Sequence, residues 1–230
     1  MKNRAVKYLS KNPLLHMGML EAINRNTALI LYAAEDGVLI RETKSGANMI
    51  SVHELEKGKE ILDLISAESL FAVHQGDLAD YIADKYKLQE RLECVQAVYT
   101  EKTRLNVSDE IQIRRLELIH KELVLEHYNK LSESEITELL REGCIFGGYK
   151  ENVLIGFGGI HLEGSIGLLE VFPEHRRKGY GAILESYIVN YILEKGFVPF
   201  GQIEVNNNNS IALQKKLGFQ ISEDSLYWLF

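Results

Sequence analysis

Apolar and polar residues alternate along several short segments of the chain, a pattern typical of β-strands. In the first hundred residues, short apolar segments predict strands at 28–32 and 38–41, on either side of the turn 35–37, and at 70–73 and 92–99. A helix is expected over 77–86, with Asp77 as its N-cap. These elements predict a small α+β domain, in which we find no chemical motif.

The segment 100–109 (TEKTRLNVSD) is the longest stretch that is polar, strand-breaking and without sustained helical periodicity. It separates two differently patterned halves, so we place a domain boundary there. The predicted domains are residues 1–105 and residues 106–230.

The second half contains several strand-like runs and several segments with helical periodicity. Strands are predicted at 111–115, 144–149, 153–160, 166–172, 200–205, 219–221 and 226–230. Helices are predicted within 116–128 and at 134–141, 179–195 and 209–217. The three consecutive strands between 144 and 172 are joined by short turns, which indicates an antiparallel meander. We therefore expect an α+β fold with a mixed, mostly antiparallel central sheet flanked by helices, preceded by the smaller N-terminal domain.

Composition and charge exclude several classes of protein. The chain has 26 basic and 33 acidic residues and a formal net charge of −7, which argues against bulk binding of nucleic acid or anionic membranes. The partly apolar stretch 14–23 is interrupted by His16 and Glu21, so neither a signal peptide nor a membrane span is expected. Cys94 and Cys144 have no histidine at metal-ligand spacing, which predicts no metal site and a reducing, cytoplasmic location.

One basic cluster is conspicuous in this acidic chain. Arg176, Arg177 and Lys178 precede Gly179 and Gly181 where an apolar strand turns into a helix. Positive charge at a helix N-terminus costs roughly a few tenths of a kcal/mol, and a bound anion would reverse the sign of that effect. Glycines leave backbone amides accessible to phosphate oxygens. The alternative is a solvated charged turn without a ligand.

The cluster matches neither of two common phosphate loops. Leu184 stands where a dinucleotide-binding loop has its third glycine, and no G-x-x-x-x-G-K-[ST] sequence occurs. The remaining pattern, Arg176-x-x-Gly179-x-Gly181, resembles the pyrophosphate-binding signature Q/R-x-x-G-x-G/A of the GNAT superfamily of acyl-CoA-dependent N-acyltransferases. Downstream, the segment 205–219 is similar to the strand and helix that follow the crossover in that family.

The resemblance covers roughly residues 110–230, and it extends to one branch of the superfamily. The spacing V-x-N-x-x-S at 205–210 and the long N-terminal half are similar to the glycine N-acyltransferase-like branch. In that branch the first half of the chain is a degenerate relative of the second half.

The resemblance implies a GNAT fold, acetyl-CoA or another acyl-CoA as cosubstrate, and no metal. It implies that the strand backbone at Leu169, Val171 and Phe172 pairs with the pantetheine amides. Asn207 and Ser210 would contact the amide arm of the cofactor, although Asn207 could instead be a helix cap. The pyrophosphate would lie against the turn, whose residues are Arg176, Arg177, Lys178, Gly179, Tyr180, Gly181 and Ala182.

Acyl transfer to an amine needs a base, donors for an oxyanion and a way to release the thiolate. The resemblance implies a tyrosine as the acid that protonates the thiolate, but Gln214 stands at that position and an amide cannot act as an acid. Water can protonate the thiolate instead, because a thiol has a pKa of about 8.5 and its thiolate can leave near neutral pH. Glu204 and Glu170 are the candidate bases, and the alternative for each is a carboxylate paired with Arg or Lys.

The sequence thus predicts an N-acetyltransferase that moves an acetyl or short acyl group from acyl-CoA to a primary amine of a small molecule or peptide. The alternative is a non-catalytic acyl-CoA-binding or interaction module of the same fold, with Gln214 as a sign of lost catalysis. No nucleic-acid or membrane partner is expected, because three basic residues make too small a footprint. The acceptor and the oligomeric state do not follow from the sequence.

Overall fold

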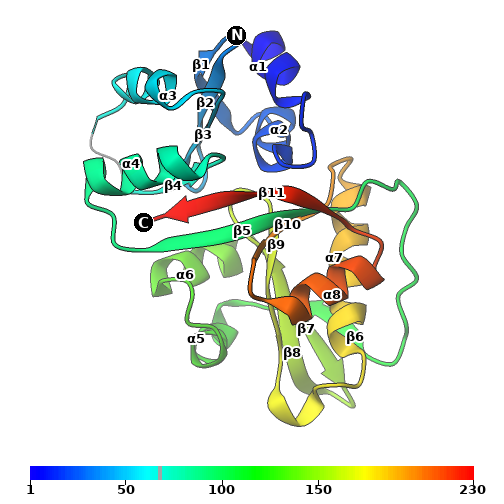
Figure 1. The fold of residues 1–230 in the computed structure, drawn as a ribbon. Helices are drawn as coiled ribbons and strands as arrows, with labels where there is room; N and C mark the ends of the chain where they lie inside the picture. Colours follow the sequence, from blue (N-terminus) through cyan, green and yellow to red (C-terminus); the bar gives the residue numbers. More distant parts are fainter. Residues whose placement is uncertain (67–68) are drawn as a thin grey trace. The chain divides into compact units, whose positions relative to one another are not determined.

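The computed structural model describes residues 1–66 and 69–230 (Figure 1). Contacts within the chain divide it into two compact units. The first unit consists of residues 1–98 and 200–230, and the second consists of residues 99–199. Each unit has its own strands, helices and buried apolar core, and each is described by itself.

The strands of the first unit form a sheet in the order β1-β2-β3-β4-β11-β5-β10. They are β1 (Ala28–Ala33), β2 (Gly37–Glu42), β3 (Asn48–Val52), β4 (Phe71–Val73), β11 (Gln220–Leu229), β5 (Arg91–Val98) and β10 (Phe200–Glu204). The β3–β4 pair is parallel, and the other strand pairs in this unit are antiparallel. The last strand of the chain therefore lies between two strands of its first half.

The described part of the first unit contains the helices α1 (Lys2–Leu9), α2 (Met17–Asn24), α3 (Leu55–Leu62), α4 (Gly76–Tyr86) and α8 (Asn208–Lys216). Helices α1 and α2 lie on one side of β1 to β3, and α3 and α4 lie on the other (Figure 1). Ile40 and Met49 accordingly pack in the core with α1 and α2, whereas Leu39 and Ile50 pack in the core with α3 and α4. Because both faces are covered, these strands are continuous apolar runs rather than strict alternations.

The second unit contains four antiparallel strands in the order β9-β8-β7-β6. They are β6 (Gln112–Arg115), β7 (Ile145–Lys150), β8 (Val153–Ile160) and β9 (Ile166–Val171). Its helices are α5 (Lys121–His127), α6 (Glu133–Arg141) and α7 (Tyr180–Glu194). Apolar residues of α5 and α6 form one core with the sheet, and those of α7 form another, so helices cover both faces.

Local signals explain the ends of several helices in the second unit. Ser132 caps α6, since its hydroxyl accepts from the amide of Glu135 and the carboxylate of Glu135 accepts from the amide of Ser132. Gly179, with a φ of +84°, is the N-cap of α7, and Gly196 follows its C-cap with a φ of +78°. The residues described include no helix with both the length and the apolar character needed to cross a bilayer.

The predicted fold class is confirmed, and so is the meander of β7, β8 and β9. Two predictions about elements are wrong. Helix α4 begins at Gly76 with Gln75 as its N-cap, while the carboxylate of Asp77 accepts from the adjacent Leu78 amide at 2.8 Å. The two predicted terminal strands are one strand, β11, with a register shift between Ile221 and Ser225. The helix predicted within 116–128 is present as α5, which a 3₁₀ turn at Leu118–His120 precedes.

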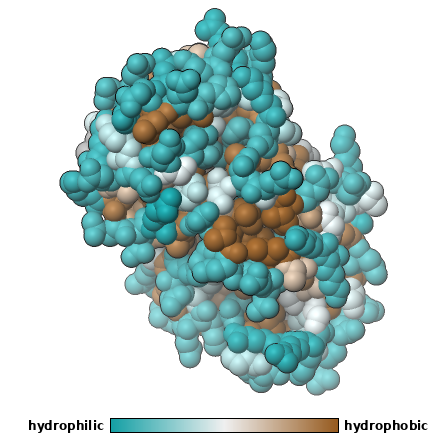
Figure 2. All heavy atoms as spheres, viewed as in Figure 1, coloured by the Kyte–Doolittle hydropathy of each residue, from teal (hydrophilic) through white to brown (hydrophobic). Residues whose placement is uncertain are grey.

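The compact units do not coincide with the predicted domains. Strands β10 and β11 pair with β5, so residues 200–230 have most of their contacts with the first 98 residues. The predicted domain boundary near residue 105 stays a prediction. The face shown in Figure 2 is mainly hydrophilic, with one larger apolar patch and several small ones, whereas most of the large apolar side chains are buried in the cores.

Candidate functional site

The basic turn connects β9 to α7 through a 3₁₀ turn at Pro173–His175. Two residues of the connection have left-handed backbone conformations, Arg177 with a φ of +62° and Gly179 with a φ of +84°. A side chain at position 179 would be strained at that φ, which explains the glycine there. Consecutive backbone amides left free at the N-terminus of a helix can bind an anion.

The amides of residues 177–181 have no hydrogen-bond acceptor among the residues that the structure describes. The helical pattern begins with the amides of Ala182 and Ile183, which both donate to the carbonyl oxygen of Gly179. Unpaired amides and the dipole of a 15-residue helix together favour an anion at this end of α7.

The space beside this row of amides is open. A Cβ added at Gly179 would meet no atom within 4 Å, and one added at Gly181 would lie 3.7 Å from a methyl carbon of Val171. Packing within the protein therefore does not demand a glycine at position 181. Approach of a ligand to the backbone is a physical reason for a glycine there.

Arg176 is held by the protein itself. Its Nη2 lies 2.6 Å from Oε1 of Glu170, and its Nε donates to the carbonyl oxygen of Val171 at 2.8 Å. Glu170 is thus paired with an arginine, which the sequence analysis gave as the alternative to a role as the base. Arg177 and Lys178 are exposed and form no ion pair with any carboxylate that the structure describes.

Strand β9 is irregular just before the turn. Phe157 pairs with Glu170 and Gly159 pairs with Gly167, so two residues of β9 face one residue of β8, which is a β-bulge. One of the two, Leu168, has a φ of +54°. A bulge redirects the backbone groups and side chains of a strand beside a site.

The backbone of Phe172 is already engaged. Its amide donates to the carbonyl oxygen of Ile155 at 3.0 Å, and its carbonyl oxygen accepts from the amide of His175 at 2.8 Å. Its ring stacks on the ring of His127, with 4.2 Å between the centroids. Because amides alternate in direction along a strand, the amide of Val171 points away from β8. The predicted contacts of these residues and of Leu169 with pantetheine stay predictions.

The remaining predicted site residues belong to the first unit. Glu204 ends β10 and pairs in register with Cys94 of β5. Asn207 is the N-cap of α8, and its side-chain oxygen accepts from the amide of Ser210 at 3.1 Å. This oxygen therefore has the helix-capping role that was the alternative to cofactor binding. Gln214 lies in α8 with only 6% of its surface exposed. Two pairs of predicted site residues are therefore in contact: Asn207 with Ser210 by a hydrogen bond, and Glu170 with Arg176 by an ion pair.

Within the described part of the chain, no group of three or more His, Cys, Asp or Glu side chains could hold a metal ion. Sequence reasoning missed three residues that one pocket of the first unit brings together: His16, Ser51 and His74. They come from three separate segments, so no spacing in the sequence could reveal them.

Comparison with known proteins gives a consistent result. The family model described as FR47-like protein matches residues 159–229, which include the turn, α7, β10 and α8. No curated protein sequence matches the chain significantly. The solved structures that are similar to it include several GNAT proteins.

A GCN5-related N-acetyltransferase-like protein from Streptococcus suis has 12% identity and a TM-score of 0.60, with 100% of this chain and 98% of that chain covered. A putative GNAT acetyltransferase from Novosphingobium aromaticivorans has 13% identity and a TM-score of 0.58, with coverage of 94% and 95%. A tandem GNAT protein from the clavulanic acid biosynthesis pathway has 12% identity and a TM-score of 0.51, with coverage of 100% and 93%. The chain therefore has the fold of these GNAT proteins.

Proposed function

We propose that this protein is an acyl-CoA-dependent N-acetyltransferase that moves an acetyl or short acyl group to a primary amine of a small molecule or peptide. One observation carries the proposal: the unpaired amides of residues 177–181 at the N-terminus of α7, beside open space and two unpaired cations. Such a row suits the pyrophosphate of acetyl-CoA. The GNAT fold and the FR47-like match over the same segment support it.

The cosubstrate supplies a thioester whose carbonyl carbon accepts the amine nitrogen as the bond to sulfur breaks. The amides of the turn hold the pyrophosphate, and Arg177 and Lys178 add positive charge beside it. The Arg176–Glu170 ion pair joins the end of β9 to the turn and so keeps the row of amides in position. The amide of Val171, directed away from β8, is a donor suited to an oxyanion.

Glu204 and Glu170 remain the candidate bases that take the proton from the substrate ammonium group. Of the two, Glu170 already pairs with Arg176 through Oε1, which leaves Oε2 for a proton. Asn207 and Ser210 are proposed contacts of the pantetheine arm. The cytoplasmic location and the lack of nucleic-acid and membrane partners stay predictions from the sequence.

We also propose that the first half of the chain is a degenerate GNAT copy, as in the glycine N-acyltransferase-like branch. The order α1-α2-β1-β2-β3-α3-β4-α4-β5 repeats as α5-α6-β7-β8-β9-α7-β10-α8-β11, and both meanders are antiparallel. In the first copy only His53 and Glu54 separate β3 from α3, and α3 carries Glu56 in its first turn. Glu54 and Glu56 put negative charge at that helix entry, and its one glycine, Gly58, packs against Leu78, so the first copy is unsuited to hold a pyrophosphate.

A second candidate, a non-catalytic acyl-CoA-binding module, is favoured by Gln214, which cannot act as an acid. The test is acceptor-dependent release of the CoA thiol from acetyl-CoA, screened over small amines, amino acids and peptides. Turnover with any acceptor supports the enzyme, and CoA binding without turnover supports the module. Glu204→Gln and Glu170→Gln identify the base, with Glu174→Gln, an exposed carboxylate of the same turn, as the control.

Loss of the base should lower turnover by about a hundredfold while CoA still binds. If both variants keep the rate of the wild type, neither carboxylate is the base, and the amine must lose its proton to solvent.

A further inference from the structure

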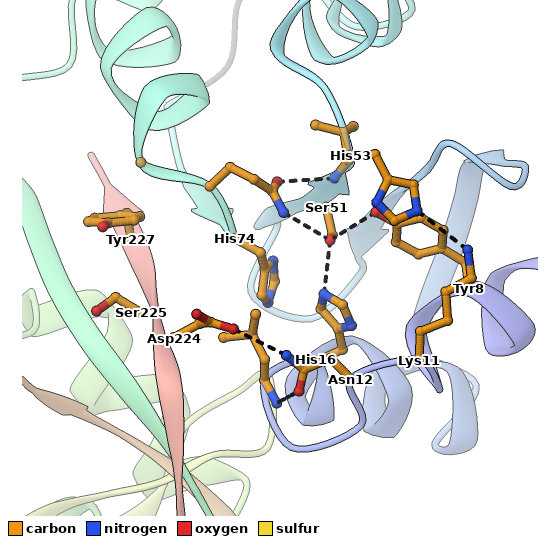
Figure 3. A pocket seen from close by; sticks show the side chains of 14 residues that line it. Tyr8, Lys11, Asn12, His16, Ser51, His53, His74, Asp224, Ser225 and Tyr227 are labelled. Atoms are coloured by element: carbon orange, nitrogen blue, oxygen red, sulfur yellow. Dashed lines mark hydrogen bonds between the residues drawn. The ribbon is translucent and has the colours of Figure 1, made fainter.

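The first unit contains a pocket of about 360 Å³, a volume that suits a small metabolite. Its walls come from four segments: the end of α1 with the loop before α2, the end of β3, the turn from β4 into α4, and β11 (Figure 3). All of these segments belong to the first unit, so the pocket is separate from the turn before α7.

A hydrogen-bonded network forms the floor of this pocket. Nδ1 of His16 lies 3.0 Å from the carbonyl oxygen of Leu9, and Nε2 lies 2.9 Å from Oγ of Ser51. Because a carbonyl oxygen only accepts, Nδ1 carries the proton and Nε2 accepts from the Ser51 hydroxyl. Gln75 donates to the same oxygen at 3.3 Å. Ser51 is fully buried, so this Ser–His pair is a rigid support and not a nucleophile.

His74, in contrast, has an unused acceptor in the pocket. Its Nδ1 donates to the carbonyl oxygen of Ile50 at 2.9 Å, which makes Nε2 an acceptor. No residue that the structure describes donates to Nε2, although the side chain is buried with 7% exposure. Burial, and secondarily the nearby His16, lowers the pKa of His74 to about 3, so the ring is neutral at physiological pH. Nε2 can therefore accept a hydrogen bond from an N–H or O–H group of a ligand in the pocket.

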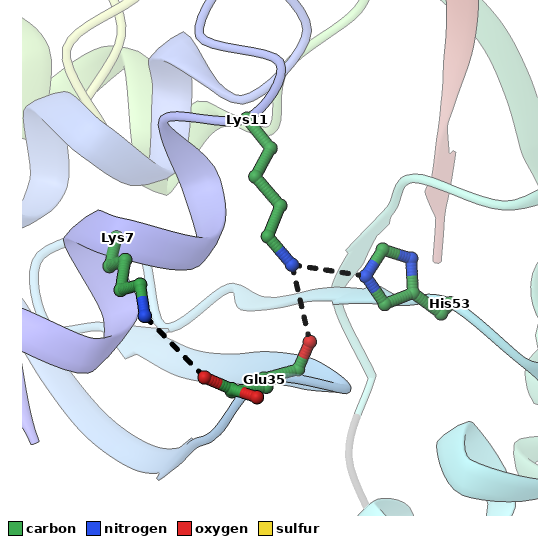
Figure 4. A network of polar contacts seen from close by, with 4 residues as sticks. All are labelled: Lys7, Lys11, Glu35 and His53. Atoms are coloured by element: carbon green, nitrogen blue, oxygen red, sulfur yellow. Dashed lines mark hydrogen bonds and ion pairs between the residues drawn. The ribbon is translucent and has the colours of Figure 1, made fainter.

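Two opposite charges lie at the rim, and neither forms an ion pair with a residue that the structure describes. Among the described residues, only the side-chain amide of Asn12 donates to the carboxylate of Asp224, at 3.4 Å. Lys11 donates to the carbonyl oxygen of Glu35 and to Nε2 of His53, both at 3.4 Å (Figure 4). The carboxylate of Glu35 pairs instead with Lys7.

Figure 3 shows Asp224 and Lys11 on opposite sides of His16, so the pocket has an acidic side and a basic side. The amide of Gly76 at the N-terminus of the 11-residue α4 also lines it and has no acceptor among the described residues.

We infer that this pocket binds a small molecule that carries both an ammonium group and a carboxylate. The ammonium group donates to Nε2 of His74 and pairs with Asp224, and the carboxylate pairs with Lys11. An anion alone gives His74 no donor and Asp224 no cation, whereas an amine alone gives Lys11 no anion to pair with. Only a zwitterion satisfies all three groups. Binding requires neither acyl-CoA nor turnover, so it can succeed or fail independently of the proposed enzyme activity.

The experiment uses the full chain and a homologous series in which the separation of the two charges grows: glycine, β-alanine, γ-aminobutyrate, δ-aminovalerate and ε-aminocaproate. Each is added at about 10 mM, and the melting temperature is measured. We expect one chain length to give the largest increase. The amine and the carboxylate of matching length should each bind at least about tenfold more weakly in calorimetry. If no member of the series raises the melting temperature, the inference is wrong.

Variants of the rim provide a second test. Asp224→Asn and Lys11→Met should each weaken the best zwitterion by about tenfold or more. The controls are Glu223→Gln, which removes the neighbouring negative charge, and Lys7→Met, which removes a positive charge one helical turn away. Neither control residue lines the pocket, so both controls should bind as the wild type does. Equal weakening in pocket variants and controls would mean a general charge effect and would overturn the inference.

Discussion

His74 is buried beside His16, and burial lowers its pKa to about 3. An unfolded chain titrates histidine near a pKa of about 6.5. Below that pH the unfolded chain therefore binds a proton that the folded protein does not bind. Stability consequently decreases as the pH decreases. The free energy of unfolding therefore keeps its full value above about pH 6.5. Near pH 5 the titration of His74 lowers it by about 2 kcal/mol. Burial also lowers the pKa of His16, which adds a loss of the same sign.

Replacing His74 by a residue that does not titrate should remove its part of this dependence. In His74→Gln the side-chain amide can still donate to the carbonyl oxygen of Ile50. Urea unfolding at pH 7.5 and pH 5 should show a loss smaller by about 2 kcal/mol in the variant than in the wild type. His16 is present in both proteins, so its effect cancels in the difference. An equal loss in both proteins would show that His74 is not buried as a neutral ring.

At the scale of one helix, the N-terminus of α7 carries the unpaired amides, and its packing leaves room for a side chain at position 181. A Cβ there makes only ordinary contacts, at 3.7 Å to Val171 and 3.8 Å to Leu169. Valine also has a higher helix propensity than glycine. We therefore expect Gly181→Val to keep the free energy of unfolding within about 1 kcal/mol of the wild type.

CoA binding should respond differently, because the branched side chain covers amides that would hold the pyrophosphate. The dissociation constant for CoA, measured by calorimetry, should rise at least about tenfold in Gly181→Val. Ile183→Val is the control, since it also places a valine in the first turn of α7 but leaves the backbone at position 181 open. Equal CoA affinity in all three proteins would remove this turn from the binding site.

For the whole molecule, CoA should stabilise the folded state. At about a hundred times its dissociation constant the gain is about 2.7 kcal/mol. For a chain of this length that corresponds to an increase of roughly 5–10 °C in melting temperature. Pantetheine lacks the pyrophosphate and is the control: it should raise the melting temperature much less at the same concentration. An unchanged melting temperature at millimolar CoA would contradict the proposed cosubstrate.

Much of the architecture follows from local signals in the sequence. The strands of the meander, helices α6 and α7, and the glycine turn before α7 were all predicted, because hydrophobic periodicity and glycine positions report on neighbouring residues. Helices α1, α2 and α3 and strand β3 were not predicted. Strand β3 (Asn48–Val52) is buried on both faces and therefore lacks the alternation by which a half-buried strand is recognised.

The sequence by itself therefore determined the mixed α+β class, the order of elements in the second half and the position of the basic turn. The tertiary structure decided that β11 lies between β4 and β5, that Arg176 pairs with Glu170, and that His16 and His74 line one pocket with Asp224. The physical reason is the range of the interactions. A periodic pattern or a glycine acts within a few residues, whereas strand pairing, ion pairs and pockets join segments that only the folded topology brings together.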